Sequence, residues 1–293
     1  MLAKVLTKCH WLIVFRAGVF CTRMLERNGE NMTKQKKLFA FRMKIISICA
    51  LFGFFLFWYL VTDVWKLAPE TLLPSPLKAL ETGITKWSVK KPDGSTLPQH
   101  IFASLRVSLL GFCFGAVIGV PLGIMMAWWE KADMCLKPVF DFIRTIPPIA
   151  WIPIMIILLG IGVVAKASIV FLSAFIPCVV NSYTGIKSTK KVHIWVGQTF
   201  GASKTRLLFK VAIPSALPYI FTGLKVSLNS SWGSLVAAEM LGSDSGLGYM
   251  IQLGRLLCRA DLIIVGMVVI GIMGTILSAI LDFMEMKLVK GAV

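Results

Sequence analysis

Long apolar blocks separated by short charged segments are the feature that most constrains how this 293-residue chain can fold. Each block is about 20 residues long, which matches the hydrocarbon thickness of a bilayer when the residues coil as a helix. Only 15% of the residues are charged and 57% are hydrophobic, which leaves too little charge to cover a soluble domain of this length. The sequence therefore predicts an all-α integral membrane protein.

Six blocks qualify as membrane-spanning helices by length and hydropathy. Between the first two, segment 65–100 is too polar and too rich in proline to span a membrane, and we expect it to lie outside with a short helix near residues 77–86. Three prolines in the third block, at positions 147, 148 and 153, are expected to bend it. The six predicted spans cover about residues 45–63, 103–128, 138–160, 167–186, 216–241 and 261–285.

The distribution of Lys and Arg predicts the orientation, because cytoplasmic segments of membrane proteins are enriched in both. With the N-terminus inside, the inner segments carry 20 basic residues and the outer segments carry 8. We therefore expect a multi-pass protein of the bacterial plasma (inner) membrane with both termini in the cytoplasm. The same placement accounts for the net charge of +17 without a nucleic-acid partner.

Residues 1–43 are expected to form a basic cytoplasmic N-terminal segment, and residues 44–293 the transmembrane domain. Three alternatives stay open for residues 1–31: an interfacial helix, a weak signal-like segment, or a stretch that is not translated because synthesis begins at Met32. We favour the third, because these residues fit no role in the predicted domain.

Cysteine and histidine give no sign of a metal centre or of a disulfide framework. The seven cysteines are scattered, no C-x-x-C pair occurs, and the three histidines are isolated in the sequence. We therefore predict no metal and no cofactor on this chain.

The connection between the fourth and fifth spans, residues 187–214, is longer than a simple link requires. Its apolar residues and glycines predict two short helices that meet at Gly201, the second ending before Pro214. Such a folded projection can insert an apolar and basic knob into a groove of another protein. Gly201 either permits a sharp bend and the close approach of a partner backbone, or merely breaks a helix.

This connection resembles the loop E-A-A-x3-G-x9-I-x-L-P of permease subunits of binding-protein-dependent ABC importers. Gly201 matches the glycine, Val211 the isoleucine, Ile213 the leucine and Pro214 the proline, whereas Trp195-Val196-Gly197 replaces the opening E-A-A. The resemblance implies a coupling helix that docks on a separate ATPase subunit. The docking residues that it implies are Trp195, Val196, Gly197, Phe200, Gly201, Ala202, Ser203, Lys204, Arg206 and Pro214.

Three further motifs resemble the nitrate/sulfonate/taurine-type branch of that family. They are Leu72-Leu73-Pro74-Ser75-Pro76, Arg144-Thr145-Ile146-Pro147-Pro148, and Ala238-Glu239-Met240-Leu241-Gly242 followed by Ser245-Gly246-Leu247-Gly248-Tyr249. The resemblance implies a fold like that of type I ABC importer permeases and the import of a small anion such as a sulfonate, taurine or nitrate. It also implies an external binding protein, a second permease copy in a homodimer, and two ATPase subunits that carry ATP and Mg²⁺.

The stretch Gly201-Ala202-Ser203-Lys204-Thr205 superficially resembles a phosphate-binding loop. A true one needs Gly directly before Lys and a preceding strand, and neither is found. We therefore expect no enzymatic activity on this chain.

The fifth span is the most polar of the six, and several of its hydroxyl groups share one helical stripe. Such groups either line the translocation pathway or pack against neighbouring helices. We expect Lys225 to reach the membrane edge, and Glu239 to pair with Arg106 or to cap a turn. The candidate pathway residues are Ser227, Asn229, Ser230, Ser231, Ser234 and Glu239, with Arg144 and Pro147 of the third span.

Two other functions are considered. A secondary transporter driven by an ion gradient usually needs intramembrane acidic residues and internal repeats, and the spans are poor in Asp and Glu and show no repeat. A membrane enzyme would need paired acids or a histidine cluster at one membrane face, which the sequence lacks.

Overall fold

The computed structural model describes residues 45–46, 49–50, 52–67, 69–70 and 72–289, and the chain divides into two units, Met1–Leu67 and Ala68–Val293. In the first unit, residues Phe52–Val64 form an apolar helix whose last turn is the π-helix η1 (Leu60–Val64). This helix overlaps the predicted first span, residues 45–63. The predictions for residues 1–43 lie outside the described residues.

The second unit is helical throughout its described secondary structure. Four of its helices are long and apolar enough to cross a membrane, and they match the second, fourth, fifth and sixth predicted spans to within a few residues at most ends. The helices are α2 (Pro76–Ser88), α3 (Leu97–Trp128), α4 (Glu130–Thr145), η2 (Pro148–Trp151), α5 (Ile152–Leu159), α6 (Val163–Lys187), α7 (Lys191–Thr199), α8 (Lys204–Leu207), η3 (Leu208–Ala212), α9 (Ile213–Leu241), α10 (Leu247–Leu256) and α11 (Ala260–Val289).

The predicted third span over residues 138–160 is divided between two helices. The segment consists of α4 followed by η2 and α5, with a bend of 85° at the break. Ile146, which precedes Pro147, adopts an extended conformation because a proline disfavours the helical conformation of the residue before it. The expected bend at these prolines is thus confirmed, but it is sharp enough to separate two helices.

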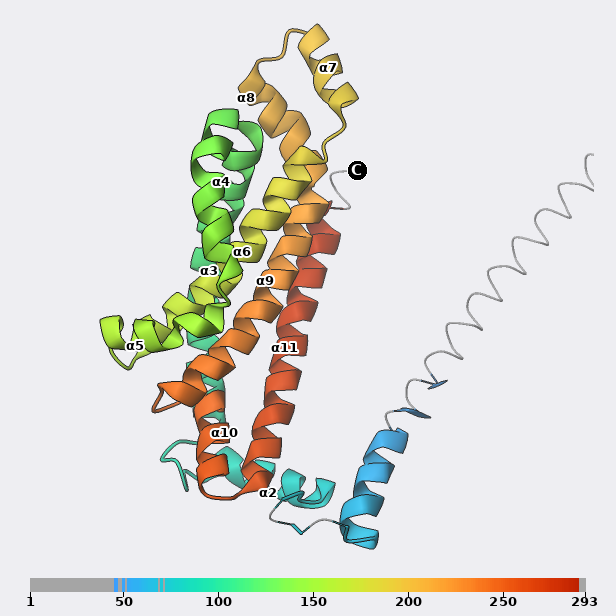
Figure 1. Ribbon diagram of the computed structural model, residues 1–293. Helices are drawn as coiled ribbons and strands as arrows, with labels where there is room; N and C mark the ends of the chain where they lie inside the picture. The colour runs from blue at the N-terminus through green and yellow to red at the C-terminus, as the bar shows by residue number, and fades with distance from the viewer. Residues whose placement is uncertain (1–44, 47–48, 51, 68, 71, 290–293) are drawn as a thin grey trace, which may run out of the picture. The chain divides into compact units, whose positions relative to one another are not determined.

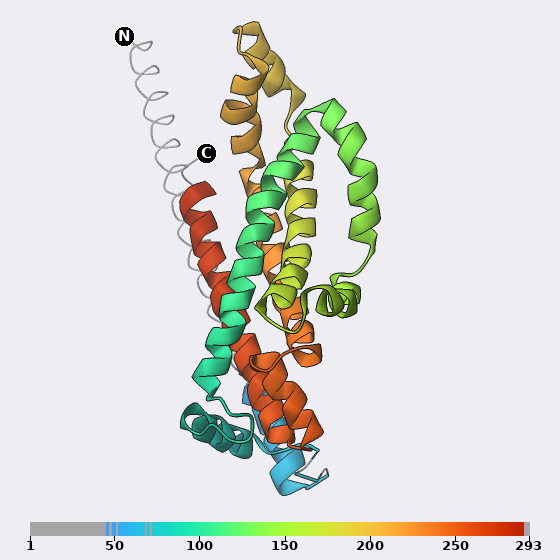
Figure 2. The same ribbon diagram turned by 90° about the vertical axis from the view of Figure 1, so that its left-hand side faces the viewer.

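Close packing of α3 on α6 forms the largest helix contact of the second unit (Figure 2). Gly111, Gly115, Gly119 and Gly123 recur every fourth residue on α3, and each faces the backbone or a small side chain of α6. A Cβ atom at Gly115 would lie only 2.6 Å from the Ala174 Cβ. Small residues let two membrane helices approach this closely, and van der Waals packing then holds them together.

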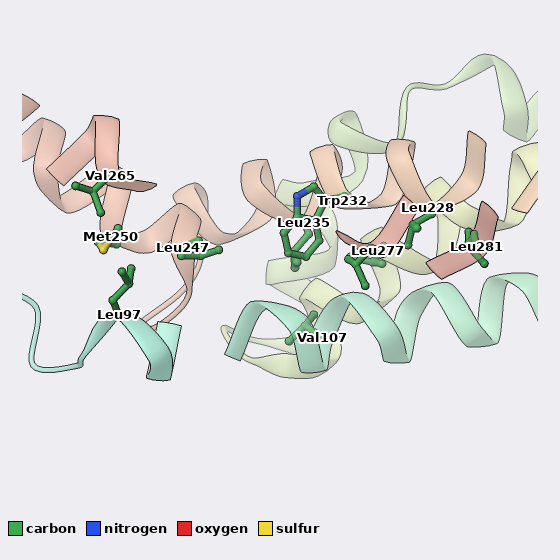
Figure 3. Close-up of a cluster of buried hydrophobic side chains, with 11 residues drawn as sticks. Leu97, Val107, Leu228, Trp232, Leu235, Leu247, Met250, Val265, Leu277 and Leu281 are labelled. Carbon is green, nitrogen blue, oxygen red and sulfur yellow. The ribbon is translucent and has the colours of Figure 1, made fainter. Parts of the chain in front are cut away.

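The main apolar core joins α3, α6, α9, α10 and α11. Figure 3 shows leucines of α9 and α11 around Trp232, whose indole Nε1–H donates to the carbonyl of Ile270 at 3.2 Å. The buried members of this cluster are Leu97, Val107, Val170, Leu228, Trp232, Leu235, Leu247, Met250, Val265, Leu277 and Leu281.

The two ends of the second unit carry different short helices, with α7 and α8 at one end and α2 and α10 at the other (Figure 1). The predicted helix near residues 77–86 is confirmed as α2, which begins at Pro76 with the Ser75 hydroxyl accepting from the Lys78 amide. Helix α10 was not predicted, because residues 242–260 read as a simple connection.

We predict that Gly115→Leu destabilises the folded protein by about 3 kcal/mol, because the added side chain forces α3 away from α6. The matched control is Gly271→Leu on α11, where a Cβ atom would meet nothing within 4 Å. Thermal unfolding of both variants in the same detergent measures the difference. Equal unfolding midpoints for the two would contradict the packing argument.

Candidate functional site

Helix α7 ends at a turn whose backbone needs a positive φ, which glycine adopts more easily than other residues. Gly201 has a φ of 73°, its amide donates to the Gln198 carbonyl at 2.9 Å, and the Ala202 amide donates to the Gly197 carbonyl at 3.0 Å. This pair of hydrogen bonds is the Schellman motif, which ends a helix at a glycine. The predicted meeting of two helices at Gly201 is therefore confirmed.

The turn holds α7 firmly against the next helix. The Ser203 hydroxyl caps α8 by accepting from the Arg206 amide at 3.3 Å. Leu207 is 2% exposed and reaches Gly197 so closely that a side chain there would collide with it. Helices α7 and α8 and the turn between them, residues 191–207, therefore form a folded projection.

Large apolar side chains of this projection point away from its own chain. Phe200 is 85% exposed, and three residues of α7 are each more than half exposed: Val192, Trp195 and Val196. Such an apolar surface next to basic groups is typical of a protein–protein contact. The basic residues of segment 187–210 are Lys187, Lys190, Lys191, Lys204, Arg206 and Lys210, and it contains no Asp or Glu.

The prediction that the second short helix ends before Pro214 was wrong. Helix α8 continues through η3 into α9, and residues Lys204–Leu241 form one candidate span of 38 residues. Pro214 fits inside this helix because it lies near the start of α9, where η3 has shifted to π-type hydrogen bonding. At 1.5 Å per residue the helix is ~57 Å long, much more than the ~30 Å hydrocarbon layer.

The polar residues of α9 divide between two faces. Ser227, Ser231 and Ser234 are buried, and the Ser227 hydroxyl donates to the Ala174 carbonyl of α6 at 2.9 Å. Asn229 and Ser230 are exposed, and Asn229 accepts from the Ser278 hydroxyl of α11 at 3.2 Å. The packing alternative therefore suits the three buried serines, whereas Asn229 and Ser230 face away from the neighbouring core.

Arg144 and Pro147 lie at the 85° bend between α4 and η2. Arg144 is paired with Asp141 at 2.9 Å, and both residues are partly exposed. Pro147 is exposed. The structure does not bring these two residues into contact with the polar residues of α9.

Glu239 holds the first turn of α10. Its carboxylate, 1% exposed, accepts from the Ser104 hydroxyl at 2.8 Å and from the Gly248 amide at 2.9 Å. The same hydroxyl accepts from the Leu247 amide at 2.9 Å. Glu239 thus caps a turn as expected, where its negative charge meets the positive end of a helix dipole. The alternative pairing with Arg106 is wrong.

Close packing of α10 on Glu239 explains why positions 246 and 248 of the motif Ser245-Gly246-Leu247-Gly248 are glycines. Gly246 has a φ of 117°, and a Cβ atom there would collide with the Glu239 carboxylate. A Cβ atom at Gly248 would lie 2.5 Å from the Val236 carbonyl oxygen. Both glycines are needed to bring the α10 backbone onto Glu239.

A second buried polar cluster was missed from the sequence. Lys86 forms an ion pair with Asp93 and donates to the Ser95 carbonyl at 2.6 Å, and His100 Nε2 lies 3.0 Å from Asp93 Oδ2. His100 Nδ1 accepts from the Gly246 amide at 3.1 Å. These residues come from a helix, a loop and the next helix, so no spacing in the sequence could have shown the cluster.

Lys225 does not simply reach toward the membrane edge. It bridges Asp282 and Glu285 of α11 and so connects α9 to the last helix. No group of three or more His, Cys, Asp or Glu residues with metal-binding geometry occurs in the part of the chain that the structure describes.

The sequence was compared with known protein families. The family described as "binding-protein-dependent transport system inner membrane component" matches residues 119–291, more than half of the chain. The chain belongs to this family. It is therefore a multi-pass inner-membrane permease subunit of an ABC importer, not the ATPase, and membership implies an ATPase and a binding protein as partners.

Individual relatives match over most of this permease. The taurine transport system permease protein TauC of Escherichia coli is 33% identical over 84% of this chain and 90% of its own length. The nitrate import permease protein NrtB of Synechocystis sp. is 34% identical over 73% of this chain and 79% of its own. The bicarbonate transport system permease protein CmpB of Synechococcus elongatus is 29% identical over 90% of this chain and 96% of its own.

The fold also matches a solved structure. A chain of the inward-facing MetNI methionine ABC transporter superposes with a TM-score of 0.57 at 21% identity, over 67% of this permease and 96% of that chain. The similarity confirms the helical fold of the family.

We predict that Glu239→Ala destabilises the permease by about 3 kcal/mol, because the Gly248 amide and the Ser104 hydroxyl lose their buried charged acceptor. Glu81→Ala is the control, since the side chain of Glu81 is 71% exposed and its contact with Lys78 lies at the surface. Thermal unfolding measures both variants. A midpoint for Glu239→Ala equal to that of the control would show that the carboxylate does not hold α10.

Proposed function

We propose that this permease admits a small inorganic or organic anion, such as taurine or another sulfonate, nitrate or bicarbonate, delivered by an external binding protein. The named relatives carry taurine, nitrate and bicarbonate, small solutes that share an anionic oxygen-rich group. One observation supports the mechanism above all: an exposed apolar and basic projection, α7 to α8, is continuous with the membrane-spanning helix α9.

The projection is the surface on which the ATPase docks. Phe200, Trp195 and Val196 provide the apolar contact, and basic residues such as Lys204 and Arg206 surround it. The Schellman turn at Gly201 fixes the angle between α7 and α8, so Gly201 acts by shaping the contact. Two ATPase copies would serve two permease copies in a homodimer.

Force enters the membrane domain through the helix itself. ATP binding draws the two ATPase subunits together, and each projection moves with its ATPase. Because α8, η3 and α9 are one helix, movement of the projection tilts α9 and shifts the population between inward- and outward-open states.

The solute path follows the exposed face of α9. Asn229 and Ser230 supply amide and hydroxyl groups that can donate to an anion without binding it tightly. The path does not include Ser227, Ser231 and Ser234, because these three side chains are buried. The helix of residues Phe52–Val64 and the bent α4–α5 pair complete six spans, with α7 and both termini in the cytoplasm.

We predict that Phe200→Ser raises the dissociation constant between permease and ATPase about thirtyfold, the effect of losing roughly 2 kcal/mol from a central contact, and so lowers the amount of ATPase that co-purifies. Phe200 packs on little of its own chain, so permease stability should not change. Leu256→Ser is the control, because Leu256 is 65% exposed at the α10 end. Normal ATPase recovery with Phe200→Ser would contradict the docking role.

We predict that a cysteine at position 230 reacts with a small water-soluble maleimide, whereas a cysteine at position 231 does not. Ser230→Cys faces the proposed aqueous path and Ser231→Cys faces the packed interior. Both are made in a variant without other cysteines, and labelling is measured by mass spectrometry in the assembled transporter. Equal labelling of the two positions would argue against a path along this face.

A further inference from the structure

An apolar groove of about 470 Å³ runs along the exposed face of α3. Phe102, Phe114 and Val117 on its walls are each more than 60% exposed. Arg106 is the one charged residue in its lining. The groove is lined by Phe102, Leu105, Arg106, Leu109, Leu110, Cys113, Phe114 and Val117.

A second cavity of about 440 Å³ adjoins this groove and shares Phe102 and Arg106 with it. Its lining includes Gln99 of α3, Lys166 of α6 and Ser245 of the loop before α10. The two spaces therefore meet at Arg106, and the second also contains the cationic Lys166 and the polar Gln99 and Ser245.

The positive charge of Arg106 has no acidic partner among the described residues, and no acidic residue lines either space. Lys166 is only 4% exposed and donates to the Ser243 hydroxyl at 2.8 Å. An uncompensated cation on a membrane helix is costly. A bound anion would remove that cost.

The position of Arg106 along α3 fits the level of lipid head groups. The helix has 32 residues, so it is ~48 Å long and exceeds the ~30 Å hydrocarbon layer by ~9 Å at each end if centred. Arg106 lies ~14 Å from the first residue, and its long side chain can reach the interface from there. Residues 109–117 lie deeper, at the level of acyl chains.

We propose that these two spaces form one site for an anionic phospholipid. The phosphate binds between Arg106 and Lys166, with Gln99 and Ser245 as further polar partners. One acyl chain lies in the groove along Leu109, Cys113 and Val117. A small imported anion would have no use for the apolar groove, and a zwitterionic phospholipid would bring a further cation into a site that already holds Arg106 and Lys166.

The test uses the complete permease assembled with its ATPase in membranes that contain a phosphatidylglycerol with a photoactivatable group in its acyl chain. After illumination, peptide mass mapping measures the label on residues 109–117. We expect Arg106→Gln to reduce this label about tenfold, the effect of losing roughly 1.4 kcal/mol of charge-assisted hydrogen bonding. Arg106→Lys keeps the charge and should retain most of the label.

Arg259→Gln is the matched control, because Arg259 is an exposed arginine in a polar cavity at the α2 end and should leave the label unchanged. Unfolding midpoints confirm that all variants are folded. Equal labelling of wild type and Arg106→Gln would overturn the proposal. Equal labelling by a phosphatidylcholine probe would overturn it too, and so would displacement of the label by soluble glycerol phosphate. The absence of label on residues 109–117 would also overturn it, because it would mean that another helix covers the groove.

Discussion

The continuity of one helix from Lys204 to Leu241 is the constraint on which the proposed mechanism of this permease depends. Inside a bilayer every amide and carbonyl must find a partner within the protein, and a helix satisfies them all. The same hydrogen bonds make the helix stiff, which suits it to the proposed role of carrying a displacement at Lys204 into the membrane. A flexible link before Pro214 would have absorbed that displacement.

Two glycine-dependent contacts fix the ends of this helix. At one end, the Schellman turn at Gly201 presents Phe200 and Trp195 outward from the projection. At the other end, Glu239 accepts from the Gly248 amide of α10, which the glycines at 246 and 248 allow to approach. The stripe of glycines on α3 keeps the neighbouring α3–α6 pair tightly packed.

Much of this could be predicted from the sequence, because hydropathy and basic-residue placement report directly on the membrane. Spans α3, α6, α9 and α11, the helix α2 and the turn at Gly201 follow from local patterns. Two of the missed features depend on distant residues: the cluster of Lys86, Asp93 and His100, and the partners of Glu239. The sharp break at Ile146 is local, but its angle is a matter of degree that proline spacing does not reveal.

The most direct test of force entry through the projection is the accessibility of a single cysteine, Phe200→Cys, in a variant without other cysteines. A membrane-impermeant maleimide is applied to intact cells and to inside-out vesicles, with and without the ATPase. We predict no labelling in intact cells, strong labelling in vesicles stripped of the ATPase, and protection when the ATPase is restored. Labelling in intact cells, or labelling that the ATPase does not reduce, would contradict the account.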